Sequence, residues 1–230
     1  MKLFDHVAGL TPIEMSTTMI DGRRYYLTPT GNKYKSVTTV ISNNPEKKAG
    51  IQRWRNRVGA EEANRISAYS TGRGNKYHKL VENFINNEHD TELYKEDTLV
   101  WDMFNASLEV LNNINNVYFQ EAALYSDVLG LAGRVDCIAE YNGKLSIIDF
   151  KTSKKYKKKE YLYDYYVQEV AYACMLLEQY NLKIEQLVTI VAVESGMPQV
   201  EIVPPKKEYL IRLEEYIKEY EQTYEGSIRG

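Results

Sequence analysis

The chain has 230 residues, of which 43% are hydrophobic and 27% charged, which is the composition of an ordinary globular protein. This length suffices for one well-filled domain, or for a core domain with an appended helical part. A formal net charge of −3 argues against wholesale coating of nucleic acid, although basic residues cluster at 53–57 and 154–159 and leave local binding open.

The sequence gives no sign of a membrane span, because no run of about 18 apolar residues occurs. The start of the chain lacks the pattern of a signal or transit peptide. Cys137 and Cys174 are the only cysteines, too few for a disulfide framework or a four-cysteine metal cluster. We therefore expect a protein of the cytoplasm, with no membrane partner and no iron–sulfur cluster.

The predicted elements begin with a short strand pair within 23–35 and continue with helices from about 37 to 85. Ser36 is a possible cap for the first helix, and Gly72 and Gly74 are expected to interrupt the helical pattern. A further helix is predicted over 97–116. Strands follow at 118–126, 131–141 and 144–152, then a helix at 161–180, two strands at 186–195 and 198–204, and a final helix at 206–224.

This order predicts an α/β or α+β fold, with a central mixed sheet of about five strands flanked by helices. Residues 1–116 would form an N-terminal strand pair and helical region, and residues 117–230 the core that carries the chemistry. Because no linker rich in Pro, Gly or Ser divides the chain, we expect the two regions to form one compact unit.

The turn Asn142-Gly143 predicts a two-residue type I′ hairpin between the strands at 131–141 and 144–152. Residue 141 then pairs with residue 144, which sets Asp136 opposite Asp149 and Arg134 opposite Lys151. Directly opposed side chains lie about 4.5–5.5 Å apart at Cβ, so two facing carboxylates would repel each other.

Two arrangements reconcile these carboxylates with folding. They share a proton, or a hard divalent cation such as Mg²⁺ or Mn²⁺ lies between them. Lys151 disfavours the shared proton, because a positive charge keeps carboxylates ionised, so the cation is the favoured interpretation. The structural alternative is a surface hairpin in which the acids merely pair with Arg134 and Lys151. A metal beside a lysine suits hydrolysis of a phosphodiester.

Several motifs in this order resemble the PD-(D/E)XK nuclease superfamily, specifically its RecB-like branch. They are Asp136, the "IDFK" that contains Asp149 and Lys151, the Gln168 and Tyr172 of "QEVAY", and the upstream His78. The segments "YKSVTTVIS" and "RWRNRVGAEEANRIS" are further similar to the mitochondrial genome maintenance exonuclease group and its bacteriophage relatives.

The resemblance implies a role for each matching residue. Asp136, Asp149, His78 and the backbone carbonyl of Phe150 would bind the metal, and Lys151 would be the catalytic lysine. Gln168 and Tyr172, four residues apart on one helix face, would support the site and contact the nucleic acid backbone. Without the family pattern, the alternative for Tyr172 is a core residue, and a histidine such as His78 is more often structural.

Further contributors to the site and to DNA binding follow from position in the sequence. Glu82 lies one helical turn after His78, and Glu121 lies on the strand that leads into the hairpin. The relatives act on single-stranded DNA with a free end beneath an arch of helices, which residues 37–116 would form here. Candidates for phosphate contacts include Arg53, Arg73, Lys154 and Lys155, and candidates for base stacking are Trp54, Tyr69 and Tyr77.

We therefore expect a Mg²⁺- or Mn²⁺-dependent exonuclease that acts on single-stranded DNA, or on DNA with single-stranded ends. Phage-type DNA processing, repair or recombination would be its setting, in the cytoplasm of a bacterial host if it is phage-encoded; replication or recombination proteins as partners stay unidentified. The alternatives are a structure-selective endonuclease on the same fold and a non-catalytic nucleic-acid-binding protein.

Overall fold

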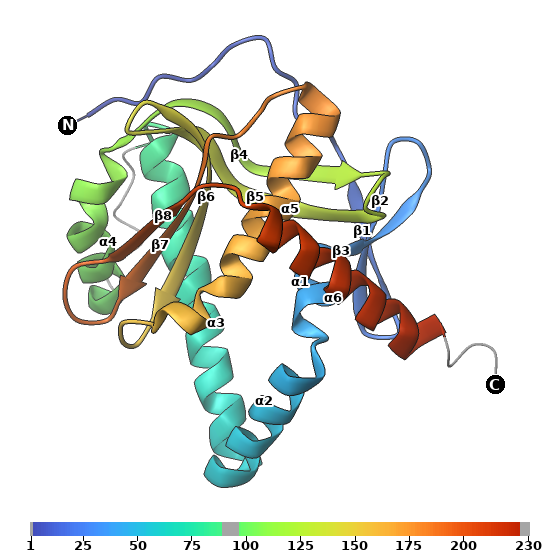
Figure 1. Ribbon diagram of the computed structural model, residues 1–230. Coiled ribbons are helices and arrows are strands. Elements are labelled where there is room, and N and C mark those ends of the chain that lie inside the picture. Colours follow the sequence, from blue (N-terminus) through green and yellow to red (C-terminus); the bar gives the residue numbers. More distant parts are fainter. Residues whose placement is uncertain (1, 89–96, 226–230) are drawn as a thin grey trace.

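The computed structural model describes residues 2–88 and 97–225 and contains one mixed sheet of eight strands (Figure 1). The strands are β1 (Ser16–Ile20), β2 (Arg23–Leu27), β3 (Lys33–Ser36), β4 (Ile114–Ser126), β5 (Leu131–Tyr141), β6 (Lys144–Ser153), β7 (Gln186–Val193) and β8 (Gln199–Val203). The helices are α1 (Val37–Ser42), α2 (Pro45–Val58), α3 (Ala60–Ile85), α4 (Thr98–Leu111), α5 (Tyr163–Tyr180) and α6 (Lys207–Glu225). The predicted mixed sheet flanked by helices is confirmed.

The sheet is wider than the five strands expected, because the N-terminal strands extend it. Its order is β1-β2-β3-β5-β6-β7-β8, with β4 paired to β5. Strand β1 was not predicted, and all five of its residues are exposed, so it carries none of the apolar alternation that signals a half-buried strand. Helix α5 makes the crossover between the parallel strands β6 and β7, as a connection between parallel strands requires.

The β5–β6 hairpin has the predicted turn and register. Asn142 and Gly143 both have positive φ, as a type I′ turn demands, and the pairing runs from Tyr141↔Lys144 to Cys137↔Ile148. The predicted pairings of Asp136 with Asp149 and of Arg134 with Lys151 are wrong, since the ladder ends at Cys137↔Ile148. Arg134 instead pairs with Ala123 of β4 and is exposed.

The reason is a change of partner along one edge of β5. The first residues of β5 pair in parallel with β3, through Ala132↔Ser36, so β6 must leave β5 before it reaches them. Asp136 lies just where β6 departs. Strands β5 and β6 therefore separate near Asp136, because β3 and β6 pair with successive parts of the same edge of β5.

Each face of the sheet is covered by helices and encloses its own hydrophobic core. Helices α1, α5 and α6 cover one face and bury residues such as Ile147 and Leu187, and α3 and α4 cover the other and bury residues such as Ile148 and Val188. No helix within 2–88 or 97–225 is long and apolar enough to cross a membrane.

Helix α3 runs without a break through Gly72 and Gly74, which contradicts the predicted interruption. The boundary lies earlier, at Gly59, whose φ of 89° separates α2 from α3. Tertiary packing of the later part of α3, which buries Leu80 and Val81, outweighs the cost of about 1 kcal/mol for each helical glycine. The predicted helix at 97–116 ends sooner, at Leu111, because β4 begins at Ile114.

Helices α2 and the first part of α3 project beyond the sheet as a helical hairpin (Figure 1). Pro45 stands at the first position of α2, and the side chain of Asn44 accepts a hydrogen bond from the Lys47 amide at 3.1 Å, which together start this helix. α2 buries none of its residues. This projecting hairpin is the part of the chain that the sequence predicted as an arch.

Candidate active site

Three side chains from three elements form a group that could bind a metal ion: His78 of α3, Glu121 of β4 and Asp136 of β5. The His78 Nδ1 lies 4.0 Å from Glu121 Oε1 and 3.7 Å from Asp136 Oδ2. One atom from each residue lies within 4.8 Å of the others. An imidazole with two carboxylates is a donor set that suits Mn²⁺ or a similar divalent ion.

The backbone of β4 turns Glu121 toward this group. Glu121 has a φ of +46°, which a non-glycine residue adopts seldom and at a cost of order 1–3 kcal/mol. This conformation breaks the alternation of side chains along β4, so that both Gln120, which bonds Asn86 after α3, and Glu121 face α3. Strain of this kind concentrates at functional sites.

Asp149 and Lys151 of β6 form a buried ion pair beside this group. Asp149 is 2% exposed, and its Oδ2 contacts Lys151 Nζ while its Oδ1 accepts a hydrogen bond from Gln168 at 3.3 Å. Burial raises the pKa of Asp149 to about 6, although the Lys151 ammonium opposes the shift. For Lys151, burial favours a lower pKa, but the carboxylates of Asp149 and Asp136 outweigh it and raise the pKa.

The amide of Phe150 joins the two groups, because it donates to Asp136 Oδ2 at 2.8 Å. The edge of the Phe150 ring also meets the His78 ring, at 6.3 Å between centroids and 88° between planes. Burial disfavours the charged form of His78, but Glu121 and Asp136 outweigh burial and raise its pKa. The carboxylates around His78 therefore favour a positive charge at this position, and a divalent cation would neutralise their negative charge.

Comparison with known proteins identifies the fold to which this arrangement belongs. A model of the PD-(D/E)XK nuclease superfamily matches residues 52–229, well over half of the chain. The chain belongs to this superfamily. Nucleases of this type use divalent metal ions, which agrees with the donor set of His78, Glu121 and Asp136.

The chain is also similar to mitochondrial genome maintenance exonuclease 1. Identity is 27% over 201 residues with the Mus musculus protein and 26% over 201 residues with the Homo sapiens protein, and in each case 80% of this chain is covered. The chain spans 59% and 58% of these two relatives. A crystal structure of a protein from Eubacterium rectale assigned as an exonuclease aligns with a TM-score of 0.43 and 12% identity, over 61% of this chain and 62% of that one.

Helix α5 packs against the candidate site through Gln168 and Tyr172, which lie one turn apart as expected. Gln168 bonds Asp149, and Tyr172 is 2% exposed. The Tyr172 ring lies against Gly133 of β5, where an added Cβ would come within 2.7 Å of the ring carbon Cε1. Gly133 is thus required for the close approach of α5 to β5, a role that sequence reasoning missed because a strand glycine carries no chemistry of its own.

A second missed residue is Glu169, next to Gln168. It is fully buried and accepts a hydrogen bond from Thr189, the residue of β7 that pairs with Asp149. Its Oε2 has no hydrogen-bond partner among the described residues. Burial raises the pKa of Glu169 well above its ordinary value, with Asp149 adding to the effect. The sequence alone gave no signal that this helical glutamate would be buried.

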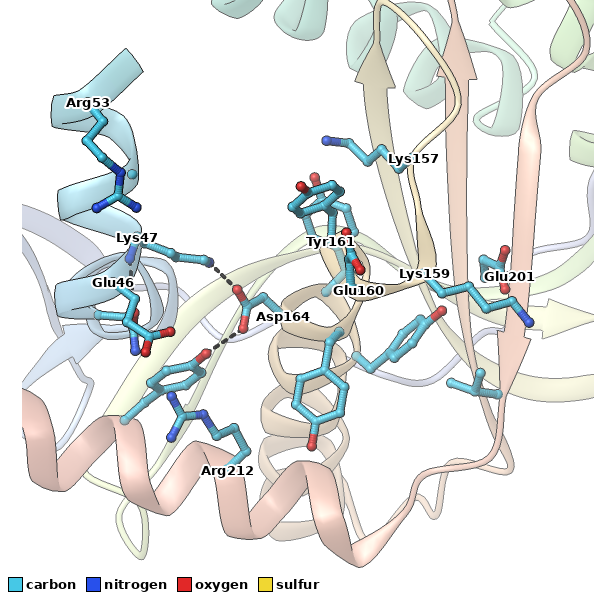
Figure 2. A pocket seen from close by; sticks show the side chains of 17 residues that line it. Glu46, Lys47, Arg53, Lys157, Lys159, Glu160, Tyr161, Asp164, Glu201 and Arg212 are labelled. Carbon is cyan, nitrogen blue, oxygen red and sulfur yellow. Dashed lines mark hydrogen bonds and ion pairs between the residues drawn. The ribbon is translucent and has the colours of Figure 1, made fainter. Parts of the chain in front are cut away.

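Two cavities flank the loop that follows β6. The larger, of about 1160 Å³, lies between α2, the start of α5, β8 and α6 and is lined by residues that include Arg53, Lys157 and Tyr165 (Figure 2). The smaller, of about 580 Å³, lies along α3 and includes Lys154 and again Lys157. We call the larger cavity the arch cleft. Tyr165 connects it to the site, since Lys151 Nζ lies 5.1 Å from the centre of its ring.

The residues predicted to contact DNA phosphates differ in how accessible they are. Arg53 lines the arch cleft, and Lys154 and Lys155 are exposed on the loop after β6. Arg73 is 8% exposed, paired with Glu194 and bonded to Thr152, so internal contacts occupy its guanidinium.

Two further predicted residues, Glu82 and Tyr77, lie on α3. Glu82 pairs with Lys79 at 3.1 Å and lies outside the metal group. Tyr77 is fully buried and donates a hydrogen bond to Ser107, so the expectation that it stacks on bases is wrong.

Proposed function

We propose that this nuclease is an exonuclease that hydrolyses single-stranded DNA from a free end with the help of a divalent metal ion, Mg²⁺ or Mn²⁺. The observation that carries the proposal is the connection between Lys151 and the arch cleft: the Lys151 ammonium lies against Tyr165, and Tyr165 lines the cleft beneath α2. A strand that entered the arch cleft by its end would approach the lysine past Tyr165.

His78, Glu121 and Asp136 would hold the ion. Asp149 and the backbone carbonyl of Phe150 are further proposed ligands, and the Phe150 amide already donates to Asp136. When bound, the ion polarises the phosphodiester and lowers the pKa of a water molecule. The Lys151 ammonium, fixed between Asp149 and the Tyr165 ring, would stabilise the negative charge that develops on the phosphate oxygens.

Preference for a single strand is supported by the lining of the arch cleft. Tyrosines and basic residues line the arch cleft together, and this combination suits stacked bases and a phosphate backbone. The names of the mouse and human relatives, mitochondrial genome maintenance exonuclease 1, support the choice of an exonuclease. We propose phage-type DNA processing, repair or recombination as the biological setting of this activity.

The test compares linear with circular single-stranded DNA in Mg²⁺, in Mn²⁺ and in a chelator. Asp149→Asn, which keeps the size of the side chain, should abolish hydrolysis, and Asp102→Asn, an exposed acid of α4, is the matched control. Metal-dependent loss of the linear form alone is the expected result. Cleavage of the circle would instead favour the endonuclease, and binding without hydrolysis would favour the non-catalytic nucleic-acid-binding protein.

A further inference from the structure

An ion pair crosses the arch cleft at its boundary with the site. Lys47 of α2 contacts Asp164, in the first turn of α5, and Figure 2 shows the Lys47 side chain extended from its helix toward this carboxylate. The Tyr216 hydroxyl of α6 donates to the other oxygen of Asp164 at 2.6 Å. Three helices that are distant in the sequence therefore meet at one carboxylate.

This ion pair separates two cavities. Lys47, Asp164 and Tyr165 line both the arch cleft and a small pocket of about 130 Å³ on its other side. Gln168 lines the small pocket and bonds Asp149. The Lys47 ammonium therefore lies between the arch cleft and a pocket whose lining reaches Asp149 through Gln168.

The contact between Lys47 and Asp164 is easily exchanged. The Lys47 side chain is 40% exposed and that of Asp164 20%, and an ion pair this close to solvent contributes little net stability. If another anion takes the ammonium, Asp164 keeps the hydrogen bond from Tyr216. Burial raises the pKa of Tyr216 to about 12, so its hydroxyl stays protonated and remains a donor.

We propose that Lys47 binds a phosphodiester of the substrate strand, and that Asp164 occupies this position until the strand arrives. This inference rests on the proposed function and adds to it a phosphate site at the boundary of the arch cleft. Asp164 thus competes with the substrate for one cation. The competing explanation is purely structural: an acid in the first turn stabilises α5, and the ion pair ties α2 to α5.

The two explanations predict opposite signs for Asp164→Asn. Competition predicts that this variant binds single-stranded DNA more tightly than the wild type, by about 1.5- to 5-fold, the range expected for releasing a partly exposed ion pair. A structural tie predicts lower thermal stability and no gain in affinity. Lys47→Met should weaken binding and reduce the slope of log K against log salt by about 0.7, as one lost phosphate contact does for a single strand.

The experiment measures the affinity of the full chain for a fluorescent oligothymidylate by anisotropy, in a chelator that prevents hydrolysis. Lys47→Arg, which keeps the charge, should bind like the wild type. Glu208→Gln and Lys206→Met are matched controls, because they make similar changes in an exposed ion pair outside the arch cleft. Thermal unfolding of each variant reports whether it is folded.

Tighter binding by Asp164→Asn that disappears in the double variant with Lys47→Met would support the proposal. Unchanged affinity in a folded Asp164→Asn variant, an equal gain in Glu208→Gln, or a gain that persists without Lys47 would overturn it. Hydrolysis of linear single strands by the wild type tests the proposed function separately. A wild type that cuts DNA while Asp164→Asn shows no gain would refute only the Lys47 site.

Discussion

Replacement of Gly133 by alanine should destabilise the protein, because Tyr172 occupies the space that a Cβ would need. The added atom would lie 2.7 Å from Cε1, 2.9 Å from the hydroxyl oxygen and 3.2 Å from Cζ of the Tyr172 ring. The ring cannot move aside into solvent, since Tyr172 is 2% exposed and lies within the core between α5 and the sheet. Either the helix or the strand must shift.

Overpacking of this kind costs about 1–3 kcal/mol. At about 2–4 °C for each kcal/mol in a chain of this size, the melting temperature should fall by roughly 2–12 °C. Urea unfolding followed by circular dichroism gives the free energy directly. Because Gln168 lies one turn before Tyr172 and bonds Asp149, hydrolysis of DNA should also slow in Gly133→Ala at temperatures where the variant is folded.

Two controls isolate the contact. Gly72→Ala changes a helical glycine with nothing within 4 Å of the added Cβ, so it should stabilise the chain by up to about 1 kcal/mol. In a Tyr172→Leu background the Gly133→Ala penalty should largely vanish, because interacting residues are not additive. A Gly133→Ala chain as stable as the wild type, or a penalty unchanged in the Tyr172→Leu background, would refute the reasoning.

Two further predictions concern the acids of the site. Glu121→Gln should weaken Mn²⁺ binding, measured by calorimetry, by at least about tenfold, whereas Glu82→Gln outside the metal group should not; equal losses would argue against the assigned ligands. Because the pKa of Glu169 is raised by burial, the contribution of Glu169 to wild-type stability should fall as pH rises from about 4.3 toward that pKa. The free energy of unfolding of Glu169→Gln relative to the wild type should therefore increase over this pH range. A difference that does not change with pH would contradict a raised pKa at Glu169.

Local rules were sufficient for much of the fold. The turn Asn142-Gly143 determined the hairpin and its register as far as Cys137, because a type I′ turn leaves one way to pair the flanking strands. The change from helical to alternating patterns located β4 to β8 and α5 in order. The four-residue spacing of Gln168 and Tyr172 likewise placed both on the face of α5 that meets the sheet.

The sequence by itself also named most residues of the site, since His78, Asp136, Asp149, Lys151 and Gln168 are all within it or beside it. It did so because these side chains carry recognisable chemistry in a recognisable order. The tertiary structure decided which of them lie together: His78 and Asp136 gather with Glu121, and Asp149 pairs with Lys151. β3 pairs with the first residues of β5, so the β5–β6 ladder ends at Cys137, and no local signal in the hairpin contains that information.

Long-range packing also decided the features that local patterns predicted wrongly or not at all. Helix α3 continues through Gly72 and Gly74 because its later turns pack on the sheet, and Gly133 matters only because Tyr172 approaches it from another element. The contact of Lys47 with Asp164 joins residues more than a hundred positions apart. Sequence patterns describe each residue with its near neighbours, whereas these contacts exist only after the chain has folded, so only the tertiary structure determines them.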